Sequence, residues 1–351
     1  MTSTITSKQT IGCDLGDRYS HLCVLDGAGE VVTRARVATT RSGFSKWFKE
    51  VVPSRVALEV GGHSRWVARL LTELGHEVTV ANARQVRLIH KASRKNDQLD
   101  AEKLARLARL DLKLLSPIVH RSEQSQTELS VLRSRDQLVR ARTELINHVR
   151  GVSKACGVRI PKCTSESFVR RVDKTELSEG LRAALQPLLL ALGALTEQIK
   201  SYERTIERMA QRKQELQPLL QIHGVGELTA MAFVLTLQDP ARFGSGRNVG
   251  AYLGLVPRQW QTGNSDPQLR ISKCGDAFVR RLLVNCAQRI LGPFGQDSDL
   301  RRYGQRLHLR GGKNAKKKAV IAVARKLAVL MHRLWCTGEI YRPLRAQPTA
   351  A

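Results

Sequence analysis

The spacing of hydrophobic and polar positions changes along the chain, and each change predicts a different kind of structure. Near the start, short apolar runs at 10–15, 21–25 and 31–37 are separated by the turn signals Gly16-Asp17 and Asp26-Gly27-Ala28-Gly29. Short runs joined by such brief turns are typical of antiparallel strands. The pattern therefore predicts an antiparallel meander over the first forty residues or so.

Strands and helices alternate in the next part of the chain. The apolar positions predict, in order, a helix over 42–51, a strand over 55–60, a helix over 64–74, a strand over 77–80 and a helix over 83–92. Alternation that follows an antiparallel start predicts a mixed sheet flanked by helices. With acidic residues ending the first and a later strand, this order of elements is that of an α/β domain of the ribonuclease H-like type.

The strand pattern disappears between residues 124 and 213, where apolar residues recur at three- and four-residue steps. One amphipathic helix is marked by Leu129, Leu132, Val139, Leu145 and Val149, and a second by Leu185, Leu188, Leu192, Leu195, Ile199, Tyr202, Ile206 and Met209. Two long helices rich in Arg, Gln and Glu outside the apolar stripe suggest an antiparallel or intermolecular coiled coil. A plain helical bundle in the core of one domain is an equally good interpretation.

The last part of the chain is expected to be mainly α-helical. An apolar segment from Leu219, the turn His223-Gly224-Val225-Gly226 and a helix over 227–237 have the form of a helix-hairpin-helix. Gly224 and Gly226 would let backbone N–H groups approach a phosphate at the start of the second helix, although an ordinary tight turn between helices has the same pattern. Further helices are predicted over 277–291 and 319–335. The chain is thus divided into domains at 1–120, 121–215 and 216–351.

Four carboxylates in the first hundred residues are the strongest sign of chemistry. Asp14 and Glu59 end two apolar strands, and Asp97 and Asp100 open a helix that runs through Leu110. Acidic groups at the ends of buried strands are costly unless a positive charge neutralises them. Their convergence on one point would suit a hard divalent cation with oxygen ligands.

The charge balance identifies the class of partner. The chain has 58 Lys and Arg against 31 Asp and Glu, a net charge of +27. Such an excess, spread along the whole chain, implies a polyanion, nucleic acid before membrane. The segment before the last predicted helix is especially basic, with Arg301, Arg302, Arg306, Arg310, Lys313, Lys316, Lys317 and Lys318. A solvated basic face is the alternative, but we expect phosphate contacts here.

Composition also bounds the location of the protein. The first ten residues are polar and lack the apolar stretch of a secretory signal. The most apolar runs are far shorter than the roughly 20 residues of a membrane span. Seven cysteines form no Cys-x-x-Cys pair, which indicates reduced thiols rather than disulfides or a zinc site. We therefore expect a cytoplasmic protein with no membrane partner.

With these residues in view, the chain resembles the DEDD-type insertion-sequence transposases. These pair a RuvC-like domain with a carboxy-terminal transposase domain and include Piv-type DNA invertases and bridge-RNA-guided recombinases. The likeness covers nearly the whole chain and depends on six motifs in this order: Gly12-Cys13-Asp14, Leu58-Glu59-Val60-Gly61-Gly62, Lys95-Asn96-Asp97-Gln98-Leu99-Asp100-Ala101, His223-Gly224-Val225-Gly226, Tyr252-Leu253-Gly254-Leu255-Val256-Pro257-Arg258 and Ile271-Ser272-Lys273-Cys274-Gly275.

The resemblance assigns roles to particular residues. It implies that Asp14, Glu59, Asp97 and Asp100 hold Mg²⁺, or Mn²⁺, and that a serine in the loop after Arg258 acts with them. The usual pattern there is Gln/Glu-Ser-Gly, whereas this chain has Gln261-Thr262-Gly263. Thr262 is the candidate nucleophile by position, and Ser265 by its less crowded hydroxyl. Trp260, beside them, would either stack on a base or anchor the loop in the core.

The resemblance also implies a function. We expect a DNA recombinase that moves its own insertion sequence by metal-assisted phosphoryl transfer, guided by a structured non-coding RNA that pairs with donor and target DNA. Joining two duplexes implies a dimer or a dimer of dimers. The nucleic-acid contacts are expected at Gly224, Gly226, Arg258, Lys273, Arg310, Lys313, Lys316, Lys317 and Lys318. A junction-resolving endonuclease that uses water, and a non-catalytic nucleic-acid-binding protein, are the alternatives.

Overall fold

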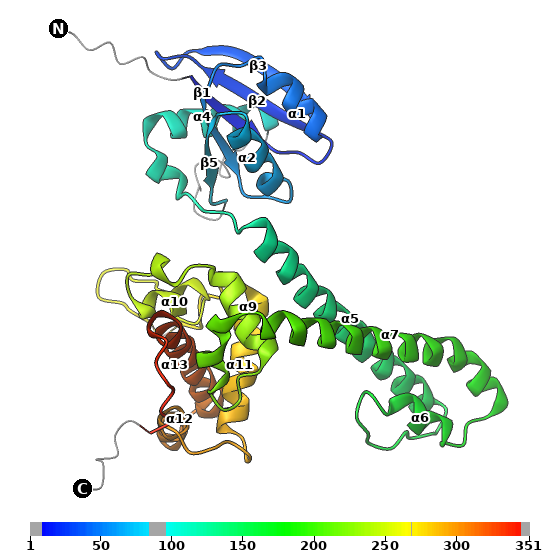
Figure 1. Ribbon diagram of the computed structural model, residues 1–351. Helices are drawn as coiled ribbons and strands as arrows, with labels where there is room; N and C mark the ends of the chain where they lie inside the picture. The colour runs from blue at the N-terminus through cyan, green and yellow to red at the C-terminus, as the bar shows by residue number, and fades with distance from the viewer. Residues whose placement is uncertain (1–8, 84–95, 268, 345–351) are drawn as a thin grey trace, which may run out of the picture. The chain divides into compact units, whose positions relative to one another are not determined.

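The computed structural model describes residues 9–83, 96–267 and 269–344, and the chain divides into two compact units, 1–120 and 121–351. Figure 1 shows a sheet with helices in the first unit and helices throughout the second. No helix among the described residues is both long enough and apolar enough to cross a membrane. The division of the second unit near residue 215 stays a prediction.

The first unit is built on a five-stranded mixed sheet, as the sequence predicts. Its strands are β1 (Thr10–Asp14), β2 (Tyr19–Leu25), β3 (Val31–Ala38), β4 (Arg55–Glu59) and β5 (Glu77–Ala81), in the order β3-β2-β1-β4-β5. The meander β1–β2–β3 is antiparallel, whereas β4 pairs in parallel with both β1 and β5. The sheet therefore fits a ribonuclease H-like domain.

Helices cover both faces of this sheet, because its strands alternate apolar side chains between the two faces. On one face, α1 (Arg41–Phe48) and α2 (Ser64–Glu73) pack in a core with Ile11, Leu22 and Leu58. On the other face, α4 (Asp97–Leu110) packs against β1, β2 and β4. The short 3₁₀ helix η1 (Leu112–Leu115) follows it. The helix predicted over 83–92 falls almost entirely on residues 84–95, which lie outside the described residues.

Two long helices open the second unit. Helix α5 (Glu123–Ala155) and helix α7 (Glu179–Gln211) contact one another and are joined through the short α6 (Phe168–Asp173). Ile146 near the end of α5 shares an apolar cluster with Leu189 near the start of α7, while Leu129 and Ile206 share another. The pair is therefore antiparallel within one chain. Pairing between chains through these helices stays a prediction.

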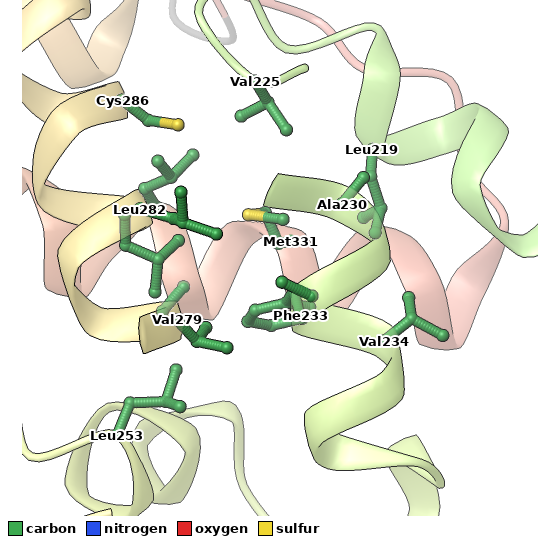
Figure 2. Close-up of a cluster of buried hydrophobic side chains, with 14 of the residues drawn as sticks. Leu219, Val225, Ala230, Phe233, Val234, Leu253, Val279, Leu282, Cys286 and Met331 are labelled. Carbon is green, nitrogen blue, oxygen red and sulfur yellow. The ribbon is translucent and has the colours of Figure 1, made fainter. Parts of the chain in front are cut away.

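The rest of the second unit is helical and packs around one core, to which Leu129 of α5 and Ile206 of α7 also belong. After η2 (Gln214–Leu216) it contains α8 (Gln217–Leu220), α9 (Glu227–Leu237), η3 (Pro240–Arg242), α10 (Gly246–Tyr252), α11 (Ala277–Leu291), α12 (Asp299–Leu309) and α13 (Ala315–Thr337). Residues 229–237 of α9 are all buried, so this helix lies at the centre. Figure 2 shows Phe233 of α9 among Val279 and Leu282 of α11 and Met331 of α13.

Two features near the carboxyl end correct the sequence analysis. The basic residues Arg301, Arg302 and Arg306 lie in α12, a helix that the sequence analysis did not predict. The last helix begins at residue 315 rather than 319, so the lysines at 316–318 lie in its first turn. Lys and Ala are both good helix formers, and a chain turn at Asn314, with φ 67°, precedes them. The lysines are therefore held on a helix, with spacing fixed by its turns.

Candidate functional site

Strand alternation places three ionisable side chains of the first unit on one face of the sheet. In β1, Ile11 and Cys13 face the α1–α2 core, so Asp14 points to the opposite face, where α4 packs. The same alternation directs Glu59 at the end of β4 to that face. His21 of β2 is the register partner of Asp14, and residues directly opposite on antiparallel strands point to the same side.

Helix α4 brings the other two carboxylates to this place, and Gly12 makes its close approach possible. A Cβ atom at Gly12 would lie 1.9 Å from the Ala101 carbonyl oxygen and 2.6 Å from the Ala105 nitrogen, so only glycine fits between β1 and α4. The first turn of α4, which carries Asp97 and Asp100, lies one turn before this contact. The Asn96 side chain caps the helix by accepting a hydrogen bond from the Gln98 N–H at 3.0 Å.

The electrostatics show that the four carboxylates converge. The pKa of Asp14 is raised from 3.8 to about 6, chiefly by burial and then by the charges of Asp97, Asp100 and Glu59, in that order, while His21 lowers it. Each of the three other acids is thus close enough to disfavour a charge on Asp14. A cation placed among them would reverse this repulsion, and their oxygens are the ligands that Mg²⁺ prefers.

Two basic side chains already contact the carboxylate cluster. The Lys103 ammonium lies 3.0 Å from Asp100 Oδ1, and His21 Nδ1 lies 3.7 Å from Asp97 Oδ2. Ligand atoms of Asp14, His21 and Asp97 all lie within 4.8 Å of one another. The sequence analysis did not single out His21, although pairing the first two predicted strands would have placed it opposite Asp14. Asp17 lies in the turn, 95% exposed, beside His63.

The second unit holds the two candidate hydroxyls at the tip of a hairpin. The backbones of Thr262 and Ser265 exchange hydrogen bonds, with N···O distances of 3.2 and 3.0 Å. Gly263 takes a φ of 54° in the two-residue turn between them, a conformation that glycine adopts at no steric cost. Because directly opposite residues point to the same side, both hydroxyls lie on one face of the hairpin. The structure places the two candidates together rather than choosing between them.

The base of this hairpin is fixed tightly to the domain. Gly254 and Gly275 both have positive φ, at 67° and 73°. A Cβ atom at Gly275 would lie 1.9 Å from the Tyr252 carbonyl oxygen, and one at Gly254 would lie 2.2 Å from the carbonyl oxygen of Cys274. Arg280 of α11 donates hydrogen bonds to the carbonyls of Leu253 and Cys274 at 2.9 and 2.7 Å. The tip is therefore exposed while its two ends are locked together.

Trp260, on the arm leading to the tip, is 65% exposed. A tryptophan that anchors a loop would bury its ring in the core. The exposure therefore excludes the anchoring role and leaves the ring available to stack on a base.

The Gly-x-Gly turn is more ordinary than a helix-hairpin-helix suggests. Helix α8 before it is a single turn, and Gly224, with φ 91°, packs against Ile290 and Cys286 of α11. Gly226 is the exposed residue that begins α9. Binding of phosphate at this turn stays a prediction.

Two family profiles match this chain. The family profile of DEDD transposases of IS110 matches residues 11–155, and that of the IS116/IS110/IS902 family of transposases matches residues 216–304. The transposase of insertion sequence element IS1328 from Yersinia enterocolitica is 32% identical over 283 residues, 79% of this chain and 82% of the relative. This chain belongs to the DEDD-type transposases of the IS110 family.

Other relatives show the range of the family. The transposase of IS1111A from Coxiella burnetii is 28% identical over 340 residues, 95% of this chain and 91% of the relative. The pilin gene-inverting protein of Moraxella lacunata is 29% identical over 115 residues, 32% of this chain and 34% of its own length. The chain is therefore a DNA transposase, related to a protein named for inverting a gene.

A basic groove of about 1770 Å³ lies in the second unit of the transposase, bordered by α10, α11, α12 and α13. Of the predicted nucleic-acid contacts, Lys273 and the lysines at 316–318 line it, whereas Arg258, Arg310 and Lys313 are exposed outside its lining. Six further basic residues line the groove that the sequence analysis did not assign to nucleic-acid binding: Arg247, Arg270, Arg325, Lys326, Arg333 and Arg342. These residues come from distant parts of the sequence, so no local sequence pattern predicts the groove.

Proposed function

We propose that this transposase moves its insertion sequence by metal-assisted phosphoryl transfer, with a side-chain hydroxyl as the nucleophile and a structured non-coding RNA as the guide. The observation that carries the proposal is the convergence of Asp14, Glu59, Asp97 and Asp100 on one face of the sheet. The raised pKa of Asp14 reflects burial and three neighbouring negative charges. Acids on rigid strands and a tightly packed helix form a preorganised site for a divalent cation.

The four carboxylates would hold Mg²⁺, with Mn²⁺ as a substitute. When bound, the ion supplies positive charge that offsets the charge developing on the attacking and leaving oxygens. The part played by the chain is to hold the carboxylates in place and to orient them. Gly12 does this indirectly, because it sets the distance between β1 and the first turn of α4.

The Thr262 hydroxyl is the proposed nucleophile. As its Oγ1 bonds to phosphorus, the phosphorus–oxygen bond of the DNA strand breaks. The threonine hydroxyl loses its proton, and the leaving DNA oxygen takes one up and becomes a free hydroxyl. The covalent intermediate conserves the energy of the phosphodiester, so that reversal rejoins strands without ATP. Ser265 lies directly across the hairpin, at the spacing of roughly 5 Å that cross-strand pairs show, and is the second candidate.

Trapping the reaction on a nicked suicide DNA substrate tests the nucleophile. We expect a phosphodiester on Thr262 when the linked peptide is mapped by mass spectrometry. Thr262→Ser should retain the adduct and Thr262→Ala should lose it, with Ser265→Ala as the matched control. An adduct on Ser265 would show that Ser265, rather than Thr262, is the nucleophile. Cleaved DNA without any adduct would favour an endonuclease that uses water, a function suggested by the threonine where the family has serine.

Guidance by RNA is supported by the basic groove and the net charge of +27. The purified protein should carry a specific RNA whose affinity falls steeply with salt, because many phosphates are contacted. If nuclease-treated protein recombines plain DNA at the full rate, the guided mechanism is wrong. Because donor and target duplexes must be joined, the active form is proposed to be a dimer or a dimer of dimers, which light scattering of the DNA-bound protein would measure.

A further inference from the structure

His21 is the one imidazole placed in the carboxylate cluster among the residues that the structure describes. It extends from β2, pairs in register with Asp14 and is only 19% exposed. The phosphoryl-transfer mechanism above assigns it no role. Its ring nevertheless faces the same point as the acids, because strand alternation directs both side chains toward α4.

The distance between His21 and Asp97 is too long for a direct hydrogen bond. Nδ1 lies 3.7 Å from the nearer carboxylate oxygen, which is longer than the roughly 2.7–3.2 Å of a hydrogen bond. Two ligands that share one ion through bonds of about 2.1 Å lie about 3–4 Å apart, depending on the angle between them. The ligand atoms of Asp14, His21 and Asp97 all lie within 4.8 Å of one another. A small inward movement of these side chains would give them the spacing of ligands around a common ion.

We propose that His21 is an additional metal ligand, whose Nδ1 binds the divalent cation together with Asp14 and Asp97. This inference builds on the proposed metal-dependent function and adds a nitrogen donor to an all-oxygen site. Imidazole is a donor for transition-metal ions, of which Mn²⁺ is the weakest binder, whereas Mg²⁺ takes oxygen donors. The centre of this transposase should therefore bind Mn²⁺ more tightly, relative to Mg²⁺, than four carboxylates alone would.

Electron spin-echo spectroscopy of Mn²⁺ bound to the full-length protein tests the proposal directly. With protein in excess over the ion, a nitrogen bonded to Mn²⁺ gives ¹⁴N modulation of the echo. We expect this modulation in the unmodified protein and its loss in His21→Asn, which places an amide oxygen near the position of Nδ1. His63→Asn is the matched control, since His63 lies nearby but contacts the exposed Asp17, and it should keep the modulation.

Calorimetric titration with Mn²⁺ and with Mg²⁺ gives a second measurement. Removal of the imidazole in His21→Ala should weaken Mn²⁺ binding by about tenfold or more, a loss of the size seen when groups supporting a metal are removed. Mg²⁺ binding should change much less. His21→Asn should likewise keep Mg²⁺ binding, which would show that both variants remain folded around the site.

The outcomes separate this inference from the proposed function. If Mn²⁺ binds and Asp14→Asn abolishes binding, but no ¹⁴N modulation appears, His21 is not a ligand and the carboxylate site stands. Modulation that persists in His21→Asn overturns the inference in the same way. If the unmodified protein binds Mn²⁺ no better than Asp14→Asn does, the metal-dependent function itself is wrong.

Discussion

Replacing Asp14 with asparagine should make the metal-free transposase more stable while abolishing recombination. The pKa of this carboxyl is raised from 3.8 to about 6, first by burial and then by Asp97, Asp100 and Glu59. An unfolded chain loses the Asp14 proton at lower pH than the folded chain does. Ionisation of Asp14 therefore destabilises the folded state as the pH rises from 3.8 through 6, and the full cost is present above the folded pKa.

The size of the effect follows from the same values. A rise in pKa from 3.8 to about 6 corresponds to about 3 kcal/mol if it is fully expressed in the free energy of unfolding. Asp14 is partly exposed, so solvent screening should reduce the effect to about 1–2 kcal/mol. Asparagine keeps the shape and removes the charge. The gain should be present at about pH 7.5 and shrink to less than half at about pH 4.5, where most of the folded Asp14 is protonated.

Hydrogen exchange during a urea titration in chelator gives the free energy of unfolding for peptides of β1 and β4, and so reports on the first unit alone. Asp17→Asn is the control, because Asp17 is 95% exposed in the adjoining turn and should leave stability unchanged. Added Mg²⁺ should stabilise the unmodified protein and not Asp14→Asn. If Asp14→Asn is less stable than the unmodified protein at about pH 7.5 without metal, the charge on Asp14 does not destabilise the fold and the reasoning is wrong.

Three further predictions concern packing and charge. Gly12→Ala should destabilise the first unit by about 1–3 kcal/mol and weaken Mn²⁺ binding, because a Cβ atom 1.9 Å from the Ala101 carbonyl oxygen forces α4 outward. An unchanged affinity for Mn²⁺ in calorimetry would contradict this. Gly275→Ala should lower adduct formation with little change in DNA affinity, because the added carbon would meet the Tyr252 carbonyl at the hairpin base; equal loss of both would point to general unfolding. Neutralising the lysines at 316–318 together should reduce the steepness of log affinity for nucleic acid against log salt concentration by roughly 3. An unchanged slope in filter binding would show that these lysines do not contact phosphates.

The sequence predicts the first unit well because its signals are local. Strands over 10–15 and 55–60 are set by apolar runs between short turns, and the structure has them at Thr10–Asp14 and Arg55–Glu59. Helix 277–291 is likewise found with the predicted bounds. Asp276 caps it by accepting hydrogen bonds from the N–H groups of Phe278 and Val279, a start signal visible in the sequence.

What the sequence alone does not yield depends on register and tertiary contact. The importance of His21 follows from its pairing with Asp14, which requires the register of two strands. The basic groove joins Arg247 of α10 to Arg333 of α13, residues that only the folded core brings together. Helix α12 was missed because its residues are mostly polar and charged, with few apolar positions to mark a period.

The two sets of candidate residues are held by different physical means, and the difference bears on how the reaction is organised. The carboxylates depend on backbone contact between β1 and α4 at Gly12, so their spacing is set by the core of the first unit. The hydroxyls of Thr262 and Ser265 lie at an exposed hairpin tip, which the second unit fixes only at its base through Gly254, Gly275 and Arg280. In the proposed mechanism the hydroxyl needs activation and the carboxylates need a nucleophile. Substitutions at the hairpin base should therefore lower adduct formation at the hydroxyls without altering the affinity of the carboxylates for metal.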